Sequence, residues 1–171
     1  DAYTRMKELL METLFDDFDY ILIDSPPSLG VLTVNALTAS RYLIAPMNPA
    51  IYSLQGTNDL MATMAKVKKN LNPELSFLGV IVNAFDAHPV ITRQIREEIE
   101  SAFGELVFRT TLSRSVKVEE ALAARRGLLA GESKVGDEIA AIGEELIERV
   151  EGSSSGGEVH CPLTVVSGEE S

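Results

Sequence analysis

Hydrophobic residues fall into two patterns along the chain. Short, continuous apolar runs occupy residues 20–23, 42–45 and 78–82, and each is followed at once by an aspartate, a proline or an asparagine. Runs of this length are typical of strands that are buried on both faces of a parallel sheet. We therefore predict strands at these three places, and a fourth strand at residues 106–111.

The segments between these runs space their apolar residues as helices do. Residues 2–18, for example, carry apolar side chains three or four positions apart, which indicates an amphipathic helix. Strands that alternate with helices form crossover connections, and these place helices on both faces of a mainly parallel sheet. The pattern therefore predicts an α/β fold. Helices are expected at residues 2–18, 31–39, 54–71, 89–103, 116–125 and 133–150.

Composition and charge divide the chain into two parts. The 171 residues are 45% apolar and carry a net charge of −11, which allows a packed core and argues against a surface coated in nucleic acid. Residues 151–171 contain four acids, no lysine or arginine, and a run of glycine and serine. We predict a folded domain at 1–150 and a flexible acidic tail at 151–171. No apolar run approaches the roughly 20 residues of a membrane span, so no membrane partner is expected.

The first predicted strand ends in an acid, Asp24, as a Walker B strand does. An acid at this place suits a nucleotide site because Mg²⁺ is a hard cation that prefers oxygen ligands beside phosphates. Aspartates also end buried strands simply as turn formers, so both interpretations stay open on this residue alone. In parallel sheets, ligands bind outside the carboxyl ends of the strands. That rule adds Asn48, Asn83 and the pair Ser113–Arg114 to the candidates.

An ordered set of motifs extends this first signal. Asp24-Ser-Pro-Pro-Ser-Leu-Gly30 is followed by Pro46-Met-Asn-Pro49, by Gly79-Val-Ile-Val-Asn83 and by Ser113-Arg114. The set, spread over residues 17–150, resembles the second half of the ParA-type partitioning ATPases. These proteins belong to the P-loop group with a deviant Walker A motif, which also includes the MinD-like proteins. The resemblance implies a P-loop NTPase type of sheet that here lacks the N-terminal phosphate-loop strand and helix.

The resemblance assigns the phosphate side of a nucleotide site to the first motif. Asp24 would be the metal-binding residue and would hold Mg²⁺ through water. The switch segment from Ser25 to Gly30, which includes Pro27, would sense the γ-phosphate. Asp24, Ser25 and Pro27 are thus the candidate catalytic residues.

The resemblance assigns the base side to the later motifs. Asn83 would bind the edge of adenine, since an amide both donates and accepts hydrogen bonds as that edge requires. Ser113 and Arg114 would lie in the loop beside the base. Ser113 stands where the family usually has proline, so contacts to adenine from this loop are expected to come from the backbone.

One hallmark of the family is missing from the 171 residues. The sequence holds no glycine-rich loop followed by lysine and serine or threonine, the feature that cradles the phosphates. In the family this loop lies N-terminal to the residues matched here. We therefore expect the chain to be the C-terminal part of a longer ATPase, and these residues alone not to hydrolyse ATP. The alternative is a non-enzymatic scaffold that has lost its phosphate loop.

The resemblance also implies a function for the intact protein. It would be a cytoplasmic, nucleoid-associated ATPase that uses ATP and Mg²⁺ to partition chromosomes or plasmids. It would form a homodimer through ATP, bind DNA without sequence preference, and be released when a ParB-like partner stimulates hydrolysis. A MinD-like positioning ATPase is the alternative within this fold, although such proteins usually end in a basic membrane-binding helix. Scattered basic residues would contact DNA phosphates: Arg93, Arg96, Arg125 and Arg126.

Overall fold

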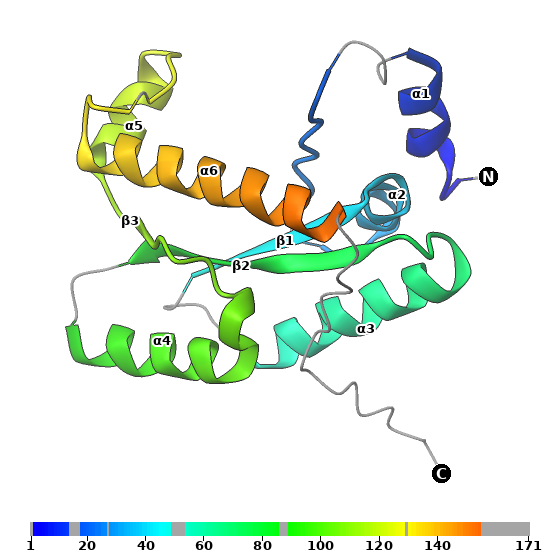
Figure 1. Cartoon of the computed structure of the whole chain (residues 1–171), viewed down its shortest axis with the longest axis horizontal. Coiled ribbons are helices and arrows are strands. Elements are labelled where there is room, and N and C mark those ends of the chain that lie inside the picture. Colours follow the sequence, from blue (N-terminus) through cyan, green and yellow to red (C-terminus); the bar gives the residue numbers. More distant parts are fainter. Residues whose placement is uncertain are drawn as a thin grey trace. The chain divides into compact units, whose positions relative to one another are not determined.

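The computed structural model describes residues 2–13, 18–26, 28–48, 54–85, 89–128 and 130–154 (Figure 1). Helices and strands alternate along this part of the chain. In chain order they are α1 (Arg5–Thr13), α2 (Val31–Ala39), β1 (Tyr42–Met47), α3 (Leu54–Asn70), β2 (Ser76–Phe85), α4 (Pro89–Phe103), the 3₁₀ helix η1 (Gly104–Leu106), β3 (Leu112–Ser113), α5 (Val116–Ala123) and α6 (Lys134–Ser154).

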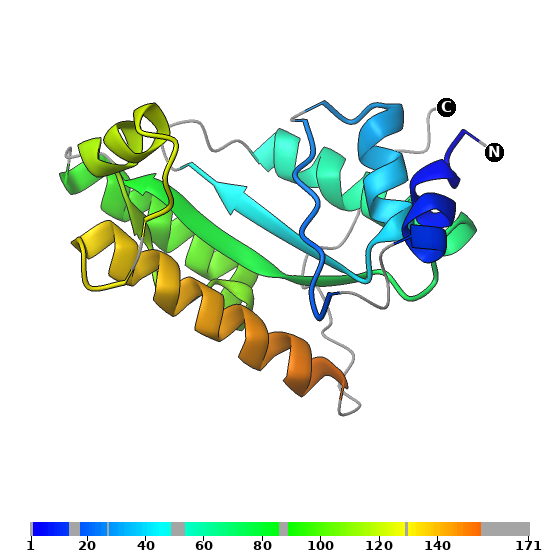
Figure 2. The ribbon, with the colours of Figure 1, turned by 90° about the horizontal axis from the view of Figure 1, so that it is seen from above.

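The three strands form one sheet in the order β1-β2-β3. Strands β2 and β3 are parallel, with Asn83 opposite Leu112 and Phe85 opposite Ser113. Helices α4 and α6 lie on opposite faces of β2, as the two perpendicular views show (Figures 1 and 2). The predicted α/β class, with a parallel sheet between helices, is therefore confirmed.

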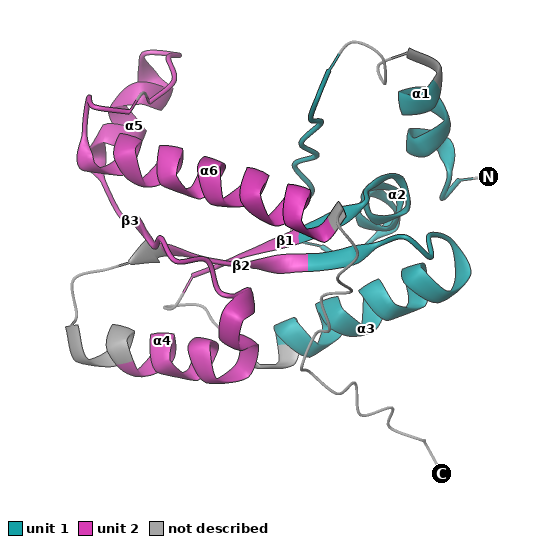
Figure 3. Cartoon of the chain, in the orientation of Figure 1, with its two compact units in different colours: residues 1–43, 53–77, 163–171 teal, residues 44–52, 78–162 magenta. Residues whose placement is uncertain are grey.

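The chain divides into two compact units (Figure 3). Unit 1 comprises residues 1–43, 53–77 and 163–171, and unit 2 comprises residues 44–52 and 78–162. Within unit 1, α2 packs against both α1 and α3. The core of unit 1 is apolar. The Asn72 side chain adds two hydrogen bonds, which it donates to the carbonyl oxygens of Leu37 (3.0 Å) and Ser40 (2.6 Å). The buried apolar side chains of unit 1 include Ala36, Leu37, Met61, Met64, Val67, Leu75 and Phe77.

Unit 2 has its core around β2. Helix α4 packs against η1, and α6 packs against β3. Because both faces of β2 are covered in this unit, its residues are apolar on both sides, as a central parallel strand requires. The buried apolar side chains of unit 2 include Leu78, Val80, Val82, Ile99, Phe103, Leu106, Phe108 and Val135.

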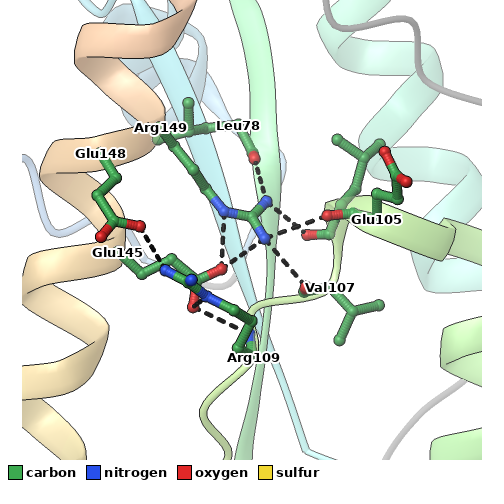
Figure 4. A network of polar contacts seen from close by, with 8 residues as sticks. Leu78, Glu105, Val107, Arg109, Glu145, Glu148 and Arg149 are labelled. Atoms are coloured by element: carbon green, nitrogen blue, oxygen red, sulfur yellow. Dashed lines mark hydrogen bonds and ion pairs between the residues drawn. The ribbon is translucent and has the colours of Figure 1, made fainter.

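A polar network joins α6 to the backbone of unit 2 (Figure 4). The Arg149 guanidinium donates to the carbonyl oxygens of Leu78 (3.1 Å), Leu106 (3.2 Å), Glu105 (3.1 Å) and Val107 (3.0 Å). It also pairs with Glu145 at 2.6 Å, and it lies 4.2 Å from the centre of the Phe108 ring.

Most of the helix predictions are confirmed. Helices α2 and α4 have the predicted bounds, and α3 ends one residue early. Helix α6 continues to Ser154, four residues past the predicted end of the last helix at 150. No described helix is both long and apolar enough to cross a membrane.

Two of the predicted strands are not found in the described part of the structure. Residues 20–23 form neither strand nor helix, and the Leu22 side chain is 79% exposed. A strand requires a neighbour for its hydrogen bonds, and no described strand pairs with this segment. The predicted strand at 106–111 is also wrong, because η1 ends at Leu106 and β3 begins only at Leu112. Within this stretch Val107 makes an isolated parallel bridge to Val80, and Arg149 binds the carbonyl groups of residues 105–107.

Two strands run past their predicted ends. Strand β1 continues through Pro46 to Met47. This is possible because β1 lies at the edge of the described sheet, where a missing N–H group is tolerated. Strand β2 continues through Asn83 to Phe85, so Asn83 lies within the strand and does not follow it.

Candidate functional site

The structure brings the three predicted base-side residues together at the carboxyl ends of β2 and β3. Asn83 on β2 lies opposite Leu112 on β3, and Ser113 and Arg114 follow directly. Because β2 and β3 are parallel, all three residues lie at the same edge of the sheet. This is the edge at which ligands bind in open α/β sheets.

The Asn83 amide is the polar group at this edge that is best placed to receive a ligand. Its side chain is half-buried and, within the described part of the chain, makes no hydrogen bond. A partly buried amide without a partner is costly, so such groups usually meet water or a ligand. An amide offers one acceptor and one donor group, which complement the edge of adenine.

Ser113, in contrast, has its polar groups occupied. Its N–H donates to Glu138 Oε2 at 2.8 Å, and its hydroxyl donates to Glu138 Oε1 at 2.7 Å. Burial alone would raise the pKa of the Glu138 carboxyl, but these two hydrogen bonds and the nearby Lys134 outweigh it and lower that pKa below the usual value. Glu138 engages the N–H and the hydroxyl of Ser113 and leaves the carbonyl oxygen as the polar group of this residue that it does not bind.

The predicted phosphate-side residues lie in unit 1. Asp24 and Ser25 are both exposed, in an extended segment without regular structure. Among the described residues, the Asp24 carboxylate makes no ion pair and no hydrogen bond. A single free carboxylate fits Mg²⁺, which usually takes one or two carboxylates and completes its shell with water and phosphate oxygens. Pro27 lies outside the described residues.

Thr33 holds the segment that follows Asp24. It lies in the first turn of α2, its side chain is buried, and its hydroxyl is 2.5 Å from the Ser28 carbonyl oxygen and 3.4 Å from that of Pro26. These contacts fix the chain between Asp24 and α2. Sequence analysis did not single out Thr33, although a threonine three residues after Gly30, at the start of a helix, is a recognisable signal.

The four predicted DNA-contacting residues differ in their surroundings. Arg96 pairs with Glu100 at 2.7 Å, and Arg126 pairs with Glu132 at 3.1 Å. Arg125 is exposed and, among the described residues, its guanidinium makes no ion pair. It adopts a left-handed backbone conformation with φ of 50°. The side chain of Arg93 lies outside the described residues.

Comparison with known proteins gives matches along most of the chain. A family model described as an AAA domain matches residues 2–77. The chain is 37% identical over 120 residues to the chromosome-partitioning ATPase Soj of Thermus thermophilus, covering 70% of this chain and 47% of that protein. It is 40% identical over 117 residues to the sporulation initiation inhibitor protein Soj of Bacillus subtilis, covering 68% and 46%. It is 35% identical over 147 residues to the chromosome partitioning protein ParA of Myxococcus xanthus, covering 85% and 52%.

A solved structure supports the same fold. Cobyrinic acid a,c-diamide synthase from Mycobacterium smegmatis, determined with a bound ATP analog and magnesium, superimposes with a TM-score of 0.69 at 28% identity. The superposition covers 92% of this chain and 57% of that one. The fold is therefore that of a P-loop NTPase-like α/β protein. Together with the Soj and ParA matches, it shows that the chain belongs to the family of ParA-type partitioning ATPases. The chain spans about half the length of the relatives it matches.

Proposed function

We propose that the complete gene product containing this chain binds ATP and hydrolyses it to ADP and phosphate with Mg²⁺. The observation that carries the proposal is the Asn83 amide, which makes no hydrogen bond within the described part of the chain and lies near Ser113 and Arg114 at the carboxyl ends of two parallel strands. The name of the Thermus relative, an ATPase, and the ATP analog bound to the synthase support it. The 171 residues alone are proposed to be inactive, since they contain no phosphate-cradling loop.

In this proposal each candidate residue has a separate role in nucleotide binding. Asn83 binds and orients the base through its amide, and Ser113 contributes its backbone carbonyl. Asp24 holds Mg²⁺ through water, and Mg²⁺ when bound neutralises the charge that develops on the phosphates. Ser25 and Pro27 belong to the switch segment beside the γ-phosphate, and Thr33 keeps that segment attached to α2.

Replacement of Asn83 tests the base site. Asn83→Ala in the complete gene product should weaken ATP binding about tenfold, because a half-buried hydrogen-bonding partner of the base is lost. It should also reduce the preference for ATP over GTP. Equilibrium titration with fluorescent analogues of both nucleotides measures this. Asn58→Ala, an exposed asparagine of α3, is the matched control. If Asn83→Ala binds ATP as tightly as the wild type, the adenine site lies elsewhere.

We further propose that the ATP-bound form contacts DNA non-specifically through Arg93, Arg96, Arg125 and Arg126. Of these four arginines, Arg125 gives the most specific test. Arg125 follows the C-cap of α5 and adopts the left-handed backbone conformation that glycine prefers there. In this conformation an arginine lowers the free energy of unfolding by about 1 kcal/mol relative to glycine. An arginine with this backbone conformation suits a functional role for its side chain.

Arg125→Gly should therefore separate DNA binding from folding. DNA affinity should fall, and the slope of log affinity against log salt should decrease by roughly 0.9, the value of one lost phosphate contact. Stability against urea should be kept or rise by up to about 1 kcal/mol. Lys66→Ala, an exposed cation of α3, is the control. An unchanged salt slope for Arg125→Gly would remove this residue from the DNA surface.

The names of the relatives support a role in the partitioning of chromosomes. We propose this role for the complete gene product, in the cytoplasm at the nucleoid, with plasmids as the alternative cargo. The protein would form a homodimer through ATP and release DNA when a ParB-like partner stimulates hydrolysis. Sedimentation in Mg-ATP and in ADP tests the dimer, and a monomer under both conditions would contradict it. Retention on anionic vesicles would instead favour a MinD-like positioning ATPase.

A further inference from the structure

Ser113, the last residue of β3, is held by one carboxylate of α6. Glu138 accepts from the Ser113 N–H through Oε2 and from the Ser113 hydroxyl through Oε1, so both of its oxygens are engaged by a single residue. The Glu138 side chain is 12% exposed, and Lys134 Nζ lies 3.5 Å from its Oε1. Two bonds to one residue restrain both its backbone and its side-chain torsion.

The strand itself gives Ser113 little restraint. Strand β3 has only two residues, and its register with β2 is irregular at this point. The step from Asn83 to Phe85 on β2 is two residues long, whereas the matching step on β3, from Leu112 to Ser113, is one residue long. At such an irregularity the ladder of backbone hydrogen bonds is locally disrupted. The two hydrogen bonds to Glu138 restrain Ser113 at this point.

The anchoring of α6 does not require Glu138. Further along the helix, Glu145 and Arg149 already attach it to the backbone of unit 2. The Glu138 contact therefore adds order locally, at the residue that ends β3 and precedes Arg114. Its main effect is on the backbone at the end of β3, near Asn83 on β2.

We propose that Glu138 is a positioning residue for the adenine nucleotide. Its carboxylate fixes the peptide of Ser113 so that the carbonyl oxygen of Ser113 and the Asn83 amide meet the base in one geometry. This inference rests on the proposed function and assigns the selectivity for adenine partly to a residue that does not touch the base.

The test compares three variants of the complete gene product by titration with fluorescent ATP and GTP analogues. Glu138→Ala should weaken ATP binding about tenfold and leave GTP binding nearly unchanged, because the proposed restraint on Ser113 serves only the contacts to adenine. Glu138→Gln should stay within about threefold of the wild type, since its amide can still accept from the Ser113 N–H and donate to the hydroxyl. Glu144→Ala, exposed on the same helix, should match the wild type.

A further variant distinguishes the loss of this contact from a general folding defect. Ser113→Ala removes one of the two bonds and should weaken ATP binding less than Glu138→Ala. Combined with Glu138→Ala it should add no further loss, since both substitutions act through the same contact. Additive losses would overturn the proposed coupling.

The remaining outcomes separate this inference from the proposed function. If the wild type binds ATP and Glu138→Ala binds it equally well with the same preference over GTP, the positioning role is wrong and the nucleotide site stands. Equal losses for ATP and GTP, together with a lower melting temperature, would show a purely structural role and also overturn it. If the wild type binds no adenine nucleotide, the proposed function falls, and this inference with it.

Discussion

Asp24→Ala in the complete gene product should abolish Mg²⁺-dependent ATP hydrolysis and leave the fold intact. The substitution removes the exposed carboxylate proposed to hold the metal, and the transferring phosphoryl group then loses the charge stabilisation that dominates this reaction. A fall in kcat of at least about 100-fold is expected. Phosphate release in steady state measures it. Because Asp24 is exposed and makes no ion pair or hydrogen bond among the described residues, the urea midpoint should not change.

Asp19→Ala is the matched control for this experiment. Asp19 is an exposed acid five positions earlier, in the same segment without helix or strand, and the variant should retain full activity. ATP binding measured without Mg²⁺ should be similar for Asp24→Ala and the wild type, because Asp24 acts through the metal. Residual turnover above one tenth of the wild-type rate would show that another residue holds the metal.

The parts of the fold that sequence predicts well are those whose pattern is local. Helices α2 and α4 have the expected bounds because their limits are set by neighbouring residues, such as Gly30 before α2 and Pro89 at the start of α4. Strands depend on partners that lie far away in sequence. Residues 20–23 have the composition of a buried strand, yet they form none in the described structure, since no strand is paired with them.

The shortened third strand shows a second limit of sequence analysis. Residues 106–111 keep only an isolated parallel bridge, between Val107 and Val80. The carbonyl groups of Glu105, Leu106 and Val107 are bound by Arg149, which lies about 40 residues later. An arginine among the many charged residues of α6 carries no signal that distinguishes it as buried. Only the folded chain shows which charges turn inward.

The candidate site is predicted unevenly for the same reason. Asn83, Ser113 and Arg114 are found because each lies near the end of a predicted strand, where the topology of a parallel sheet gathers them. Glu138 is missed because it is one of many acids on α6, and its contact with Ser113 spans 25 positions. Positions given by topology are therefore accessible from sequence, whereas the side chains that hold them in place are not.

Arg149→Ala should be the most destabilising single substitution among those proposed, with a loss of about 3–5 kcal/mol in the free energy of unfolding. The Arg149 side chain is 18% exposed and that of Glu145 4% exposed, so the substitution leaves a buried carboxylate short of its partner. It also removes the donor of four backbone carbonyl groups. Urea unfolding followed by far-UV circular dichroism measures the change.

Two further variants identify the cause of this loss. Arg109→Ala removes a 69% exposed arginine that pairs with the same helix, and it should shift the urea midpoint much less than Arg149→Ala does. Replacement of both partners, Arg149→Met with Glu145→Leu, often restores stability when an ion pair is the main interaction. Here it should recover only a minor part, because the carbonyl groups of Leu78, Leu106 and Val107 still lack the hydrogen bonds that Arg149 donates. Full recovery in the double variant would show that the ion pair, and not the carbonyl contacts, makes Arg149 necessary.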